Sequence, residues 1–133
     1  MTRSLGEALS LLADKGDINL ENSISRGIEK ESLRVSKNNT ISSADHPSSL
    51  GSALTNKYIT TDFSEALLEL ITPTHSSVED VLKNLDEICK YVVEETPETI
   101  WPSSIPCKIE NEDSFRLADY GTSNSGLLKT LYR

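Results

Sequence analysis

The sequence predicts a domain of the α+β class. Two segments, 23–35 and 58–72, are rich in β-branched and aliphatic residues and have strand character. Residues 78–96 carry apolar side chains at helical spacing, and residues 4–13 form a second, shorter amphipathic segment. The 133 residues, 36% of them hydrophobic and 26% charged, fit one globular domain.

The first amphipathic segment begins with a helix-start signal. Ser4 is placed as N-cap with Glu7 three residues later, the spacing of a capping box. Gly16 is placed to end the helix. The apolar residues that we expect to form its inner face are Leu5, Ala8, Leu9 and Leu12.

Residues 23–35 are expected to form a strand, and the polar, turn-rich residues 37–49 a loop. Residues 58–72 are ambiguous, because 64–70 contain good helix formers while both flanks have strand character. We expect one long central strand with a bend.

The clearest helix covers residues 78–96, with Ser77 as N-cap and Pro97 closing it. Its acidic face is expected to be a solvated surface, not a site. Cys89 lies on its apolar stripe, which favours a buried, unreactive thiol. The apolar stripe comprises Val78, Val81, Leu82, Leu85, Ile88, Cys89, Val92 and Val93, and the acidic face comprises Glu79, Asp80, Asp86, Glu87, Glu94 and Glu95.

The chain after Pro97 is irregular as far as a small-residue loop, 120–126, which precedes an expected helix from Leu127. This loop loosely resembles a phosphate-binding P-loop. In a P-loop, however, the lysine directly follows the second glycine, whereas two leucines separate Gly126 from Lys129. We therefore reject a P-loop. His46 and His75 are expected to be surface residues in loops.

The formal net charge of −8, with basic residues scattered singly, argues against a nucleic-acid partner. No apolar run approaches membrane-spanning length, and we expect no signal peptide, because residues 1–3 lead into an amphipathic segment. The two cysteines lie far apart and in no metal-ligand spacing. These features favour a cytoplasmic protein without a membrane partner.

Glu29 and Glu31 are candidates for metal binding. The two residues are two positions apart on the expected strand, so their side chains project from the same face, about 6.6 Å from each other. At an effective dielectric near 20 they repel by about 2.5 kcal/mol, so a half-buried pair needs an arginine or a hard cation such as Mg²⁺. The alternative is a solvent-facing strand edge.

Asp62, Glu65 and Glu69 form a second acidic candidate group, set among apolar residues that favour partial burial. In one regular strand, Asp62 and Glu69 point to opposite faces, so a bulge would be needed to bring them together. The alternative is again a polar edge.

Several sequence blocks, in a fixed order, are together specific to one family. They include 26–35 (RGIEKESLRV), 59–69 (ITTDFSEALLE), 120–124 (YGTSN) and 129–133 (KTLYR). Shorter blocks are His46-Pro47, 50–55, 71–73, Trp101-Pro102 and Pro106-Cys107. From about residue 23 to Arg133 the chain resembles the proteobacterial-type glutamate–cysteine ligases. Tyr58 and Ser64 are mild departures from the family pattern.

This resemblance implies a glutamine-synthetase-like antiparallel sheet with helices packed outside. It also implies Mg²⁺ as cofactor, ATP as co-substrate, and glutamate and cysteine as substrates in the first step of glutathione biosynthesis. The glutamate γ-carboxylate would attack the γ-phosphate of ATP, and the cysteine amine would then displace phosphate from γ-glutamyl phosphate.

Carried over residue by residue, the resemblance places Glu29, Glu31, Asp62 and Glu69 at metal-binding positions. Phe63, Tyr132 and Arg133 match positions near the cysteine substrate. No general acid or base is assigned. Two alternatives stay open: a related carboxylate–amine ligase that uses another amine, and a non-enzymatic acidic binding domain.

The family's members are several times longer than this chain. The last expected helix, from Leu127, reaches Arg133 without a signal that would end it. We therefore expect residues 1–133 to be the N-terminal portion of a single, truncated catalytic domain. The isolated piece is expected to be inactive.

Overall fold

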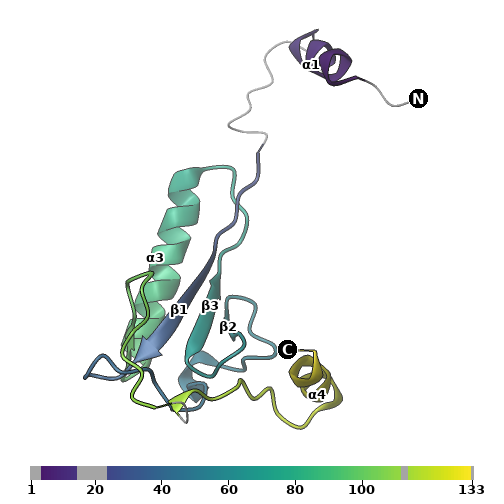
Figure 1. The fold of residues 1–133 in the computed structure, drawn as a ribbon. Helices are drawn as coiled ribbons and strands as arrows, with labels where there is room; N and C mark the ends of the chain where they lie inside the picture. Colours follow the sequence, from purple (N-terminus) through teal and green to yellow (C-terminus); the bar gives the residue numbers. More distant parts are fainter. Residues whose placement is uncertain (1–3, 15–23, 112–113, 133) are drawn as a thin grey trace.

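A computed structural model describes residues 4–14, 24–111 and 114–132 (Figure 1). The elements are α1 (Leu5–Asp14), β1 (Glu29–Val35), the short 3-10 turn η1 (Ser48–Leu50), β2 (Ile59–Thr61), β3 (Leu67–Ile71), α3 (Val78–Glu95), β4 (Thr99–Ile100) and α4 (Asn124–Leu131). No helix in these ranges is long and apolar enough to cross a membrane.

The strands form one antiparallel sheet in the order β2-β3-β1-β4, and α3 packs along one of its faces (Figure 1). Burial of apolar side chains between α3 and the sheet supplies the main core. This core contains Leu50, Ile59, Leu68, Leu70 and Val92, with Leu85, Ile88, Cys89 and Ile100 packed against it. The α+β expectation is confirmed.

The segment 58–72 is a hairpin, so the prediction of one long bent strand is wrong. β2 and β3 pair with Thr60 opposite Glu69, and the Asp62 amide donates to the Leu67 carbonyl at 3.0 Å. The helix-forming residues 64–66 lie in the connecting turn. Strand pairing on both sides of β3 satisfies its backbone and overrides the helix propensity of residues 67–70.

The hairpin turn is strained and firmly held. The Ser64 amide donates to the Asp62 carbonyl at 2.6 Å, a γ-turn, and Phe63 has φ +59°. A non-glycine residue rarely adopts this conformation, which persists only where neighbouring structure imposes it. Here the chain after residue 115 imposes it: the Ala118 amide donates to Phe63, and the Glu65 amide donates to Arg116.

The strand expected at 23–35 becomes regular only at Glu29. Before it, Arg26 forms an isolated bridge with His75, and the Arg26 guanidinium donates to the Ser76 carbonyl at 2.7 Å. Ser23 lies outside the described residues. The two-residue strand β4 is too short to leave a sequence pattern; it pairs with Arg34 and Val35.

The Ser4–Glu7 capping box of α1 is confirmed, since each side chain accepts a hydrogen bond from the other residue's amide. The expected inner face is wrong: Leu5, Leu9 and Leu12 are exposed, and α1 lies apart from the sheet (Figure 1). Gly16 falls outside the described residues.

Helix α3 begins at Val78 as expected and ends at Glu95, one residue before the expected end; its Ser77 cap and its exposed acidic face are confirmed. Val78, Leu82 and Val93 of the expected stripe are exposed. Cys89 is partly buried against the core, and this burial raises the pKa of its thiol, as befits an unreactive cysteine.

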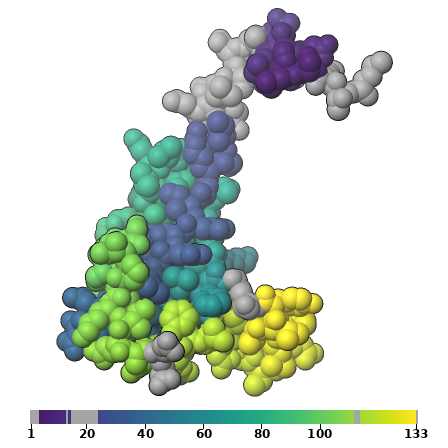
Figure 2. All heavy atoms as spheres, in the orientation of Figure 1, coloured from purple at the N-terminus to yellow at the C-terminus, as the bar shows by residue number. Residues whose placement is uncertain are grey.

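Helix α4 begins at Asn124, three residues before the expected start, because the Ser123 hydroxyl accepts from the Gly126 amide at 3.1 Å. Gly126 also lets α4 approach the preceding chain, since a Cβ there would lie 2.3 Å from the Tyr120 carbonyl oxygen. Figure 2 shows α4 as a yellow lobe at the side of the body.

Candidate functional site

Three acidic residues share the sheet face that points away from α3. Glu31 lies directly opposite Glu69 in the β1–β3 ladder, and Glu29 lies opposite Ile71. Directly opposed residues project from the same face of a sheet. The alternating residues Leu68 and Leu70 are buried in the core on the other side.

The hairpin brings Asp62 to this same face. Thr60 is opposite Glu69, and Asp62 is two residues beyond Thr60 with the ladder extended by its bond to Leu67. The bulge that a single strand would need is therefore unnecessary. We call Glu29, Glu31, Asp62 and Glu69 the carboxylate face. Its two segments are neighbours in the sheet, because β1 pairs with β3.

Negative charge on the carboxylate face is only partly compensated. Burial raises the pKa of Glu69, and the charges of Glu29 and Glu31 raise it further, while Lys129 acts in the opposite direction. Like charges directly opposite each other destabilise a sheet. A cation bound here would remove that repulsion.

The donor chemistry of the carboxylate face fits Mg²⁺, which is bound through a few carboxylates together with substrate oxygens and water. In the part of the chain that the structure describes, no three Asp, Glu, His or Cys side chains converge closely enough to hold an ion. The face therefore offers part of a coordination set, which other oxygen ligands must complete. Its metal role stays a prediction.

A cavity of about 510 Å³ borders the carboxylate face beside Glu31. Its lining includes Leu33, Leu67 and the loop 101–106. The Trp101 indole fixes this loop by donating to the Ile105 carbonyl at 2.7 Å. The cavity leaves room for a small ligand next to the carboxylates.

Two of the three residues predicted to lie near a substrate are described, and both are exposed. Phe63 stands on the strained turn, 48% exposed, with its ring centroid 6.0 Å from that of Phe115. Tyr132, at the end of α4, is 84% exposed. Arg133 lies outside the described residues. Their substrate roles also stay predictions.

Glu65 does not join Asp62 and Glu69. It is 2% exposed, and its carboxylate accepts from the His46 amide at 2.8 Å and the Asp119 amide at 2.6 Å. Its own carbonyl accepts from the buried Arg34 guanidinium at 2.8 Å. Glu65 therefore ties three segments together behind the hairpin turn.

His46 is half-buried, so the surface interpretation is wrong. Its Nδ1 lies 2.6 Å from the Thr61 hydroxyl. Burial lowers the pKa of the imidazole, and the neighbouring Arg34 charge lowers it further. The sequence offers no signal for this placement, because the contacts come from residues distant in the chain.

The lowered pKa of His46 makes stability fall in mild acid. The unfolded chain binds a proton at His46 near the ordinary pKa of 6.5, whereas the folded chain binds it only at lower pH. The contribution of neutral His46 to folding stability is therefore complete above pH 6.5 and is lost as the pH falls below it. We expect urea unfolding at pH 7.5 and 5.5 to show a larger loss in the wild type than in His46→Asn. Equal losses would contradict this.

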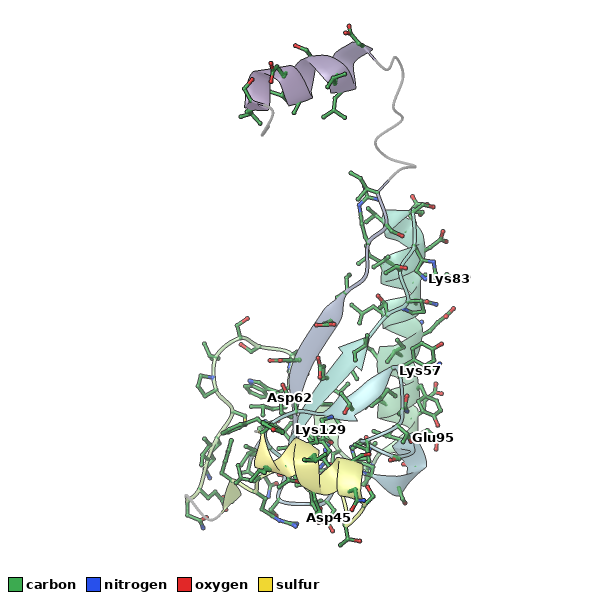
Figure 3. All side chains as sticks on the ribbon, turned by 90° about the vertical axis from the view of Figure 1, so that its right-hand side faces the viewer. Asp45, Lys57, Asp62, Lys83, Glu95 and Lys129 are labelled. Carbon is green, nitrogen blue, oxygen red and sulfur yellow. The ribbon has the colours of Figure 1, made fainter. Side chains whose placement is uncertain are left out.

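Sequence reasoning missed Lys129, Tyr120 and Thr60 as site residues. The Lys129 ammonium lies 4.1 Å from the Tyr120 ring centroid and 3.4 Å from the Thr60 hydroxyl. Figure 3 labels Asp62 and Lys129 in the region where α4 crosses in front of the sheet. The available signal was a lysine that directly follows two leucines, Leu127 and Leu128.

Comparisons with known proteins place the chain among ligases. The model of the family described as glutamate-cysteine ligase matches residues 9–133. The glutamate–cysteine ligase of Pseudoalteromonas translucida (strain TAC 125) is 47% identical over 133 residues, which is 99% of this chain and 25% of that protein. That of Aliivibrio fischeri (strain MJ11) is 50% identical over 109 residues, 81% of this chain and 21% of the relative.

Two solved structures share the fold. The glutamate–cysteine ligase of Francisella tularensis in complex with AMP matches with TM-score 0.76 and 39% identity, over 80% of this chain and 22% of that one. A bifunctional glutathione synthetase from Pasteurella multocida matches with TM-score 0.72 and 34% identity, over 80% and 15%. The chain thus spans about a quarter of the length of the curated relatives.

Proposed function

The chain belongs to the glutamate–cysteine ligase family, and from this premise we propose that it is part of an ATP- and Mg²⁺-dependent enzyme of glutathione synthesis. Residues 1–133 supply the N-terminal portion of a single catalytic domain. The observation that carries the proposal is the register of Glu31 opposite Glu69, which gathers carboxylates on one open face.

The proposed reaction joins the γ-carboxylate of glutamate to the amine of cysteine. A γ-carboxylate oxygen attacks the γ-phosphorus of ATP, and ADP leaves, giving γ-glutamyl phosphate. The cysteine nitrogen then attacks the acyl carbon, loses a proton, and phosphate leaves. Mg²⁺, when bound, neutralises phosphate oxygens as charge develops on them.

The chain's own residues contribute position and charge. Glu29, Glu31, Asp62 and Glu69 would hold the cation, and the rigid sheet fixes three of them by backbone pairing. The clamped turn fixes Asp62 and displays Phe63. Phe63, with Tyr132 and Arg133, would border the cysteine substrate.

A chimera tests this proposal. Residues 1–133 would replace the matching segment of the Pseudoalteromonas translucida ligase, to which they are 47% identical. We expect the chimera to form γ-glutamylcysteine and release phosphate from ATP only when glutamate and cysteine are both present. Activity with alanine equal to that with cysteine would instead favour a ligase for another amine.

The isolated 133 residues are expected to form no γ-glutamylcysteine. They span about a quarter of the relatives' length, and the four carboxylates do not complete a cation site within the described residues. Exposed leucines on α1 and α4 favour self-association of the piece. Product assay and sedimentation check this; a monomer that makes product would contradict it.

A further inference from the structure

Helix α4 exposes its leucines and partly buries its lysine, the reverse of the usual pattern of a surface helix. Leu127, Leu128 and Leu131 are exposed, whereas Lys129 is partly buried. A surface helix normally buries its apolar stripe and solvates its lysines. A specific set of partners on the sheet side therefore has to hold Lys129.

Those partners are themselves fixed. The Tyr120 hydroxyl donates to the Thr61 carbonyl at 2.7 Å, so the ring under the ammonium cannot turn away. The Thr60 hydroxyl donates to the Ala53 carbonyl at 2.5 Å, which leaves its lone pairs for Lys129 at 3.4 Å. The attraction between a cation and an aromatic ring face becomes stronger as water is excluded from the contact.

The position of Thr60 places Lys129 at the carboxylate face. Thr60 is opposite Glu69, which is opposite Glu31, so the three side chains run across one face of the sheet. The charge of Lys129 acts on Glu69. Lys30 follows Glu29 in sequence but alternates to the other face, where its ammonium donates to the Ser32 hydroxyl.

We propose that Lys129 is the resident counter-ion of the carboxylate face, where its ammonium competes with a divalent cation and gives way when one binds. The inference rests on the proposed function. A lysine suits this role because its compact charge sits on a flexible stem, and both its contacts are loose enough to break. Lys129 thereby lowers the affinity of the face for metal.

The test uses Mn²⁺ alone as probe on the full 133-residue chain. Amide line broadening in the NMR spectrum of the ¹⁵N-labelled chain gives both the place and the affinity of binding. We expect Lys129→Met to bind Mn²⁺ about threefold to tenfold more tightly at β1 and β3, the effect of one partly exposed charge on a divalent ion. Lys129→Gln provides the same comparison if the first variant folds poorly.

Two controls separate this role from a general charge effect. Lys129→Arg keeps the charge and should retain the wild-type affinity. Lys90→Met removes an exposed lysine on α3, paired there with Asp86, and should also leave the affinity unchanged. A gain in Lys90→Met equal to that in Lys129→Met would overturn the inference.

Failure of the inference and failure of the proposed function look different. Broadening at β1 and β3 with equal affinities in wild type and Lys129→Met would contradict the counter-ion role of Lys129 but would support metal binding by the carboxylate face. Absence of broadening at these strands in every variant would contradict both the counter-ion role and the proposed metal binding. In the wild type, Mg²⁺ should also shift the Lys129 ε-proton resonances as the ammonium leaves the Tyr120 ring; unmoved resonances at saturation would oppose displacement.

Discussion

Glu29→Gln in the chimeric ligase is expected to lower kcat for γ-glutamylcysteine formation at least about 100-fold, because loss of groups that merely support metal ligands already costs about 10- to 100-fold. Glutamine keeps the size of the side chain but removes the anionic oxygen that would hold the cation. The neighbouring Glu31 and Glu69 keep their places, since backbone pairing of β1 with β3 sets them.

Glu79→Gln is the matched control for the loss of one carboxylate. Glu79 is exposed in the first turn of α3, on the helix that packs against the opposite face of the sheet. This variant should retain nearly the full rate. Phosphate release and product should be measured together at saturating ATP and excess Mg²⁺. Wild-type turnover in Glu29→Gln would remove Glu29 from the proposed metal site.

Arg34→Met is expected to destabilise the 133-residue chain by about 3–5 kcal/mol, the usual cost of breaking a buried ion pair from one side. Arg34 is 1% exposed, forms an ion pair with Glu98, and donates to the carbonyls of Ala44, Asp45 and Glu65. Methionine would fill the space but leave Glu98 without its cation. Such a loss is a large share of the stability of a small domain.

Arg116→Met is the matched surface control. Arg116 also forms an ion pair, with Asp45, but both side chains are largely exposed, so the expected loss is below about 1 kcal/mol. Urea denaturation followed by circular dichroism at pH 7.5 gives both values. Equal losses in the two variants would contradict the central structural role of Arg34.

The sequence correctly predicted the helix caps, because these depend only on residues close together in the chain. The Ser4–Glu7 capping box and the Ser77 cap of α3 were correct because a cap needs only residues within one turn. The hairpin was missed because its turn, residues 62–66, contains no glycine or proline, and contacts from the chain after residue 115 hold Phe63 in its unusual conformation. The exposed leucines of α1 likewise depend on tertiary contacts.

The candidate site was predictable where one strand determines the geometry. Alternation placed Glu29 and Glu31 together. Their apolar surroundings singled out Asp62 and Glu69, family resemblance assigned both to the metal, and the register brings them to the same face. The partners of Glu65, His46 and Lys129 come from segments far apart in sequence, so no spacing rule could assign them.

Divalent-ion binding by the carboxylate face is the central claim, and Mn²⁺ titration of the ¹⁵N-labelled wild-type chain tests it most directly. The chain carries a second acidic surface on α3 (Glu79, Asp80, Asp86, Glu87, Glu94 and Glu95), which serves as an internal comparison. We predict that the amide signals of Glu29, Glu31 and Glu69 broaden at lower Mn²⁺ concentration than those of α3. In Glu69→Gln this difference between the two surfaces should disappear. Broadening confined to α3, or equal on both surfaces, would contradict the account.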